Sequence, residues 1–212
     1  MGLPNVVTYN LAASNVTAIV NASNTVAAGV AFTLATSVVD VNQRRLLITA
    51  TGNESSNTFT IVGTNQAGFP ITESILGPNS STVQTNLDFL TVTKITASAN
   101  TAGTTSVGTD STGSSLWNIM NWDVTPTDIS VGCIVTSVST AVNYTVEYTY
   151  DDPNNLPSGV YYPTPFALAS LASQTGNVDS YLVNPVTGIR LTVNSGTGTV
   201  RMVVTQSGIS GP

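Results

Sequence analysis

The sequence has no histidine, one cysteine and one lysine, and these shortages exclude several kinds of chemistry. Histidine is the commonest general base and a frequent metal ligand, so its absence removes any Ser-His-acid arrangement. The single cysteine, Cys133, cannot form an intramolecular disulfide. Because no histidine is present to activate this thiol, we expect Cys133 to be a small core residue in a buried strand.

Charge is also scarce. Charged residues make up 8% of the 212 residues, against roughly 25% in typical soluble domains, and the formal net charge is -6. Only Arg44 and Arg45 are adjacent among the five basic residues. We therefore expect no nucleic-acid partner, because phosphate neutralisation needs clustered Lys and Arg. A surface of Thr, Ser, Asn and Gln with few charges suits contact with other proteins, and it equally suits durability outside a cell.

Long apolar runs are missing as well. No segment approaches the roughly 20 apolar residues of a membrane span, so we expect no membrane partner. The opening stretch, MGLPNVVTYNL, has neither a basic region nor a continuous apolar region. We therefore expect that no signal peptide directs this protein to secretion.

Alternation of apolar and polar residues is the main pattern that the chain does contain. In the stretch NYTVEYTYDDP, the residues Tyr144, Val146, Tyr148 and Tyr150 occupy every second position, as on one face of a strand. No helical period longer than two turns occurs. We therefore expect an all-β protein, built as an antiparallel β-sandwich or jelly roll, or as two such sandwiches, with an extended N-terminal arm.

Clusters of Asn, Gly, Ser and Pro divide the first half of the chain into predicted strands. These strands are 44–52, 57–65, 69–76 and 88–99. In the last of them the apolar residues change face near Lys94, which predicts a bulge or a departure from the sheet.

The division into regions follows from composition. Residues 1–42 have a weak Ala-, Val-, Asn- and Thr-rich pattern, which we interpret as an N-terminal arm packed along a body. The Gly-, Ser- and Thr-rich stretch 100–115 is the predicted linker. We therefore expect a first sandwich region at 43–108 and a second at 116–212, which could also form one composite body with the first.

In the second region the turn signals predict two hairpins and a long connection. One hairpin spans 130–150 and turns at 139–143, and the other spans 188–208 and turns at Gly196-Thr197 in a type II′ turn. The Pro-rich connection 154–174 is long enough to be functional, and it contains a predicted short helix at Phe166–Ala172.

The carboxylates give the one suggestion of a chemical site. Asp151 and Asp152 are adjacent, and adjacent residues on a strand point to opposite faces unless the chain turns there. Pro153 and the two asparagines after it predict such a turn, and an ion or partner contact is the alternative. We expect no catalytic residue, no cofactor and no metal site, and we do not expect an enzyme.

Four segments carry a resemblance to a known group of proteins. They are ITATGNESSNTFTIVGTNQAGFPITESILGPN, FLTVTKITASANTAGTTSVGT, NYTVEYTYDDP and IRLTVNSGTGTVRMVVTQSG. In that order they resemble small β-rich virion structural proteins of tailed bacteriophages, over roughly residues 45–210. Residues 1–42 depart most from this group.

The resemblance implies a capsid decoration or cement protein, with a sandwich or jelly-roll body bound to the outside of the head, often as a trimer. Its partners would be the major capsid protein and sister subunits, and its location would be the virion, assembled in the host cytoplasm. A neck, tail or head-fibre component is the alternative within the same class. A host-glycan adhesin, with stacking platforms at Tyr148, Tyr150, Tyr161 and Tyr162, is the alternative in the binding class.

Eight residues are the candidates for the interface. Tryptophan is enriched at interface hot spots, arginine makes directional contacts, and tyrosine has an amphipathic ring. The candidates are Trp117, Trp122, Arg44, Arg45, Arg190, Arg201, Tyr161 and Tyr162.

Overall fold

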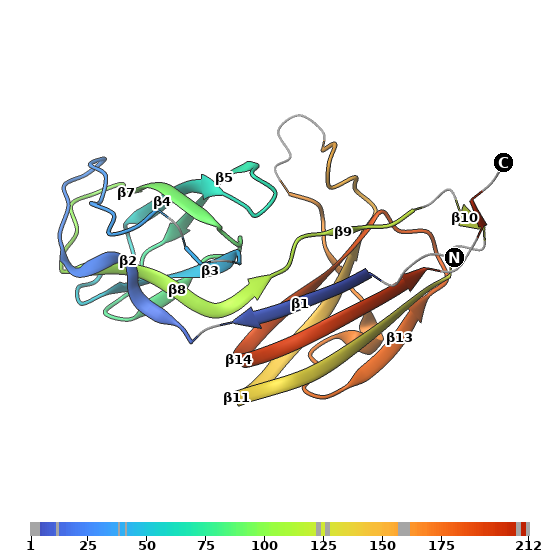
Figure 1. Cartoon of the computed structure of the whole chain (residues 1–212). Helices are drawn as coiled ribbons and strands as arrows, with labels where there is room; N and C mark the ends of the chain where they lie inside the picture. The colour runs from blue at the N-terminus through green and yellow to red at the C-terminus, as the bar shows by residue number, and fades with distance from the viewer. Residues whose placement is uncertain are drawn as a thin grey trace. The chain divides into compact units, whose positions relative to one another are not determined.

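A computed structural model describes residues 5–11, 13–37, 39–40, 42–121, 124–125, 128–156, 162–206 and 209–210. The prediction of an all-β protein is confirmed, because these residues form antiparallel strands and one short 3₁₀ turn, η1 (Ala169–Leu171). No helix in this described part of the chain is long and apolar enough to cross a membrane. The chain divides into two compact units: a sandwich unit, Ala13–Gly113, and a curled unit, Met1–Ala12 together with Ser114–Pro212 (Figure 1).

The sandwich unit consists of two antiparallel sheets. The first sheet contains β2 (Asn15–Asn24), β8 (Thr105–Ser114), β3 (Arg44–Ala50) and β6 (Thr82–Gln84). The second contains β5 (Pro70–Leu76), β4 (Thr58–Thr64) and β7 (Thr91–Ala97). Period-two burial, such as the alternation along β3 and β4, turns one face of each sheet toward a shared core. Phe59, Ile61 and Ile48 are among the fully buried residues of that core.

The bulge predicted near Lys94 is confirmed. Val62 lies opposite Lys94 and Gly63 lies opposite Val92, so Thr93 is the extra residue on β7. The extra residue moves Lys94 to the exposed side and returns Ile95 to the core.

The linker predicted at 100–115 is wrong, because most of that stretch is strand β8. This strand pairs with β3 along one edge and with β2 along the other, and nearly all of its residues are buried. Small residues are needed there, since a Cβ built on Gly108 would lie 1.8 Å from the carbonyl oxygen of Asn15. Composition indicated a loop, but a strand enclosed on both edges also favours Gly, Ser and Thr.

The expected arm, 1–42, is divided between the two units. Residues Asn5–Leu11 form β1, which pairs with a strand of the curled unit, whereas residues 13–42 belong to the sandwich unit. Part of the latter segment runs along the free edge of β7, where the amides of Gly29 and Phe32 donate to the carbonyls of Ala97 and Ile95. This segment supplies backbone partners to an otherwise open sheet edge, so the boundary at 42 is not a boundary in the fold.

The curled unit is built around two long paired strands, β11 (Ile129–Thr149) and β14 (Gly188–Gln206). Strand β1 adds to the outer edge of β14, and β13 (Val178–Leu182) adds to β11, so that these four strands lie side by side (Figure 1). Three short pairs complete the unit. They involve β9 (Asn118–Ile119), β12 (Phe166–Ala167), and β10 (Val124–Thr125) with β15 (Ile209–Ser210).

The two hairpins predicted at 130–150 and 188–208 are wrong. Each segment is one continuous strand, and β11 and β14 pair with each other from end to end. The supposed turns face each other across this pair, and the register shifts between Val135 and Tyr144 show where both strands bend together. Gly196 has a φ of +80° at the bend, which glycine adopts without strain.

Because both strands bend, one sheet supplies both walls of its own core. Val131 and Cys133 lie on one side of the bend, Tyr144 and Val146 lie on the other, and all four are buried in one cluster. The short helix predicted at Phe166–Ala172 is also corrected: the stretch forms β12 and the 3₁₀ turn instead.

Candidate interaction surface

Arg44 and Arg201 differ completely in exposure. The side chain of Arg44 is 2% exposed and forms an ion pair with Asp40 at 3.1 Å. Arg44 therefore supports the interior of the sandwich unit, and we remove it from the interface candidates, because a buried guanidinium cannot reach a partner. Arg201 lies on β14 with its side chain exposed.

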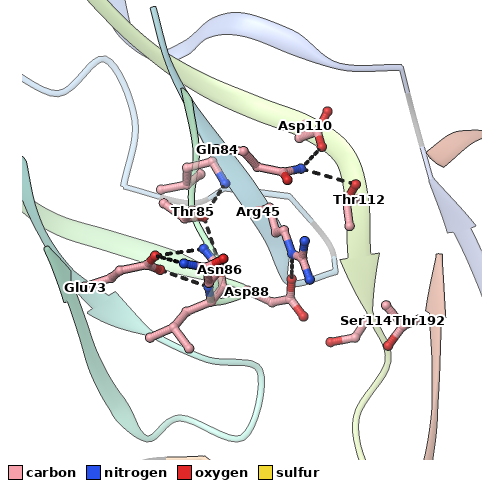
Figure 2. A network of polar contacts seen from close by, with 12 residues as sticks. Arg45, Glu73, Gln84, Thr85, Asn86, Asp88, Asp110, Thr112, Ser114 and Thr192 are labelled. Atoms are coloured by element: carbon pink, nitrogen blue, oxygen red, sulfur yellow. Dashed lines mark hydrogen bonds and ion pairs between the residues drawn. The ribbon is translucent and has the colours of Figure 1, made fainter. Parts of the chain in front are cut away.

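Arg45 belongs to a polar network on the first sheet of the sandwich unit (Figure 2). Its Nε lies 3.7 Å from the Oδ1 of Asp88, and about a third of its side chain is exposed. In the same network the amide of Gln84 donates to the carboxylate of Asp110 and to the hydroxyl of Thr112. The charged groups here have partners within the network, which leaves Arg45 as a partly exposed member of a structural network.

Two buried carboxylates hold loops of the sandwich unit. Glu73 accepts hydrogen bonds from the backbone amides of Asn86 and Leu87, each at 2.8 Å (Figure 2). Glu54 is 1% exposed and accepts from the backbone amide of Ala102 at 2.6 Å. Bonds to charged acceptors are worth about 1.5–3 kcal/mol each, so these two acids stabilise the fold.

Trp117 and Arg190, both predicted from the sequence, lie together in the curled unit. The Cζ of Arg190 lies 4.7 Å from the centroid of the Trp117 ring, a cation–π contact. The Nε of Arg190 donates to the carboxylate of Glu147 at 2.7 Å, and the hydroxyl of Thr192 donates to the same oxygen at 2.9 Å. The sequence does not reveal this cluster, because it depends on the register that places Glu147 opposite Arg190.

Three of the predicted interface candidates remain, and only one of them lies among the described residues. Trp122 and Tyr161 lie outside the described residues. Tyr162 is described, and 49% of its surface is exposed.

An aromatic cluster among the described residues of the curled unit was only partly anticipated. We name Tyr148, Tyr150 and Phe166 the aromatic patch. The rings of Tyr148 and Phe166 stack with centroids 5.7 Å apart, and the ring of Tyr150 meets Tyr148 edge-on at 5.6 Å. Tyr150 is 51% exposed and Phe166 is 44% exposed. Partial burial, followed by the neighbouring phenol of Tyr150, raises the pKa of Tyr148.

Phe166 reaches the patch because of a long-range pairing. The Pro-rich connection returns to the end of β11, where Phe166 lies directly opposite Tyr148. Alternation along NYTVEYTYDDP correctly placed Tyr148 and Tyr150 on one face. No local pattern indicates their pairing with a residue 18 positions further on.

The turn interpretation of the adjacent acids is confirmed. The carboxylate of Asp151 accepts from the backbone amide of Thr164 at 2.6 Å, and that of Asp152 accepts from the amide of Asn154 at 2.9 Å. Each acid therefore closes a local loop next to the buried Pro153. Within the described ranges, no group of three or more His, Cys, Asp or Glu residues is placed to hold a metal ion.

Cys133 lies in a buried strand, as predicted. It is 2% exposed and belongs to the same buried cluster as Tyr144, whose hydroxyl donates to the backbone carbonyl of Gly176 at 2.8 Å. Burial raises the pKa of the Cys133 thiol from 9.0 to about 12, so the thiol remains protonated at neutral pH. The pKa of Tyr144 is raised by the same burial.

The chain matches no protein-family model, and no curated protein is similar to it in sequence.

Proposed function

We propose that this chain is a structural protein of a bacteriophage virion, and that it acts as a capsid decoration protein by binding the outside of the head. The observation that carries this proposal is the aromatic patch. Tyr150 and Phe166 are about half exposed, and none of the three side chains of the patch is charged. Exposed aromatic clusters are typical of sites that bind other proteins, because they combine large apolar area with low conformational entropy.

The polar chemistry of the two units supports the same proposal. The acids with the strongest contacts hold loops or pair with a neighbouring strand. They are Glu54, Glu73 and Glu147. Asp151 and Asp152, next to the end of β11, each accept a backbone hydrogen bond through one of their two carboxylate oxygens. The patch therefore fits a protein surface that offers apolar side chains beside a Lys or Arg, and we propose the major capsid protein as that partner.

The area of the patch limits the strength of one contact. Aromatic side chains bury about 150–250 Å² each, so covering the exposed parts of Tyr150 and Phe166 removes about 200 Å² from water. At about 25 cal/mol per Å² this contributes about 5 kcal/mol. Association costs about 4–15 kcal/mol in lost freedom, so one patch binds weakly. Stable attachment then requires several contacts at once, as on a shell with repeated sites.

Shells prepared without this protein provide the test. Purified full-length chain should co-sediment with such shells, and the variants Tyr150→Ser and Phe166→Ser should each reduce the bound amount about ten-fold, since each removes roughly 1.4 kcal/mol or more of contact. Leu76→Ser is the matched control, because Leu76 is 63% exposed but lies in the sandwich unit. Equal binding by all variants, or no binding by the wild type, would contradict the proposal.

Glycan binding is a second candidate, because the same exposed rings could stack on sugar faces. A sugar platform needs a free ring face, whereas Tyr148 and Phe166 cover one face of each other at 5.7 Å. This packing favours the protein partner. Binding of the wild type to host surface polysaccharide, lost in Tyr150→Ser, would support the adhesin instead.

A further inference from the structure

The outer face of the curled sheet is a second open surface, separate from the aromatic patch. Four strands form it in the order β13, β11, β14, β1 (Figure 1). The residues of these strands that alternate with the buried ones point away from the core and are exposed or half-buried. They are Asp179 and Tyr181 on β13; Ser130, Gly132 and Ile134 on β11; Arg201, Val203 and Thr205 on β14; and Val6 and Thr8 on β1.

This outer face mixes apolar residues with hydroxyl-bearing ones, and it carries two charged residues. Tyr181 is 71% exposed and Val6 is 50% exposed, which are high values for side chains of their kind. Arg201 and Asp179 are its only charged residues. A Cβ built on Gly132, in the middle of the face, meets nothing within 4 Å. The face therefore has a low centre at Gly132, a surround of mixed apolar and polar residues, and one charge of each sign.

The register places those two charges on either side of Gly132. Asp179 lies directly opposite Gly132 on the neighbouring strand β13. Arg201 lies on the other neighbour, β14, opposite Ile134. Strands are about 4.8 Å apart and successive residues on one face are about 6.8 Å apart, so the two Cα atoms are about 12 Å apart with the midpoint over β11.

We propose that the outer face of the curled sheet binds the same face of a second copy of this chain. A two-fold axis lying between the facing sheets, through the midpoint over β11, sets Arg201 of each copy against Asp179 of the other. This single two-fold rotation forms both ion pairs. If the second copy faced the first without being rotated in this way, its Asp179 would not lie against Arg201. The missing side chain of Gly132 lets the two backbones approach near this axis.

The size of the face sets the strength that we expect. Four strands by five residues cover roughly 20 Å by 20 Å, so each copy contributes about 400 Å². The total of about 800 Å² is below the roughly 1,200 Å² of standard stable interfaces. The pair should therefore associate weakly in free solution, with a dissociation constant in about the 10–500 μM range, and more strongly where copies are held close together on a shell.

Sedimentation equilibrium of the full-length chain, up to about 1 mM, is the direct test. The wild type should show a monomer–dimer equilibrium. Arg201→Asp and Asp179→Arg should each weaken it about ten-fold or more, because each sets two like charges together twice. An equimolar mixture of the two variants should restore the wild-type strength, since the new carboxylate at position 201 meets the new guanidinium at position 179 in the mixed pair.

A second pair of variants tests the geometry near the axis. Gly132→Leu adds bulk where this chain has open space, so it should abolish the dimer without unfolding the monomer. Gly176→Leu is the control, because a Cβ there also meets nothing within 4 Å, and Gly176 lies off the outer face. A monomeric wild type at the highest concentration, a trimer, or a mixture no stronger than its separate variants would overturn the two-fold pairing. None of these results bears on binding to the shell through the aromatic patch.

Discussion

Replacing Gly196 by alanine tests the bend that gives the curled unit its shape. At this position the two long strands pass close together: a Cβ on Gly196 would lie 2.2 Å from the carbonyl oxygen of Ala141 and 3.0 Å from the Cα of Val142. The backbone of Gly196 also has a φ of +80°. Alanine therefore meets two separate penalties, a strained conformation and a collision with backbone atoms that cannot rotate away.

The two penalties can be estimated separately. A left-handed conformation costs a non-glycine residue about 1–2 kcal/mol. Overpacking against fixed atoms costs about 1–3 kcal/mol. We therefore expect Gly196→Ala to lower the free energy of unfolding of the curled unit by about 2–5 kcal/mol, a large fraction of the stability of a domain of this size.

Urea unfolding followed by tryptophan fluorescence measures this loss in the right unit. Trp117, one of the two tryptophans of the chain, belongs to the curled unit. Gly176→Ala is the control, because alanine there has open space and should change the free energy of unfolding by less than about 1 kcal/mol. If Gly196→Ala costs no more than Gly176→Ala, the close approach of the two strands at the bend is refuted.

Three further predictions concern buried or half-buried groups. Cys133 has a raised pKa and therefore keeps its proton more tightly in the folded state, so its contribution to stability is constant below about pH 9 and falls between pH 9 and about 12. In urea unfolding between pH 8 and pH 10, the free energy of unfolding of the wild type should fall by about 1 kcal/mol more than that of Cys133→Ala. An equal fall in both proteins would contradict the burial of the thiol. Glu54→Gln should destabilise the sandwich unit by about 2 kcal/mol in calorimetry, since it replaces a charged acceptor of backbone amides; an unchanged melting temperature would refute this role. Arg190→Lys should lower the free energy of unfolding of the curled unit by about 1 kcal/mol and alter tryptophan emission. Lys cannot reproduce both the bond to Glu147 and the contact with Trp117. An unaltered emission spectrum would exclude the contact with Trp117.

Local alternation was enough to predict the fold class and much of the sandwich unit. The strands around Phe59 and Ile95 were predicted because each places apolar residues on one face only, and even the bulge at Thr93 changes that pattern visibly. The strand β8 escaped prediction because it is enclosed on both edges, so small residues such as Gly108 replace the usual large apolar ones.

The long strands of the curled unit show a different limit. Gly and Ser near position 196 are turn signals in sequence, and the same residues permit a bend in a strand that continues. Only the pairing of β11 with β14 distinguishes a turn from a bend, and that pairing is a contact between residues far apart in the chain. The aromatic patch was half predicted for the same reason: Tyr148 and Tyr150 follow from alternation, whereas Phe166 depends on tertiary pairing.

The proposal that this chain is a decoration protein is tested most directly by counting its copies in purified bacteriophage particles. Quantitative mass spectrometry against the major capsid protein gives the ratio of the two chains. Decoration predicts on the order of hundreds of copies per particle, in a simple ratio to the capsid protein, because repeated weak contacts must cover a repeated lattice. About a dozen copies or fewer, the number set by a single ring or vertex, would contradict decoration and favour the neck, tail or fibre.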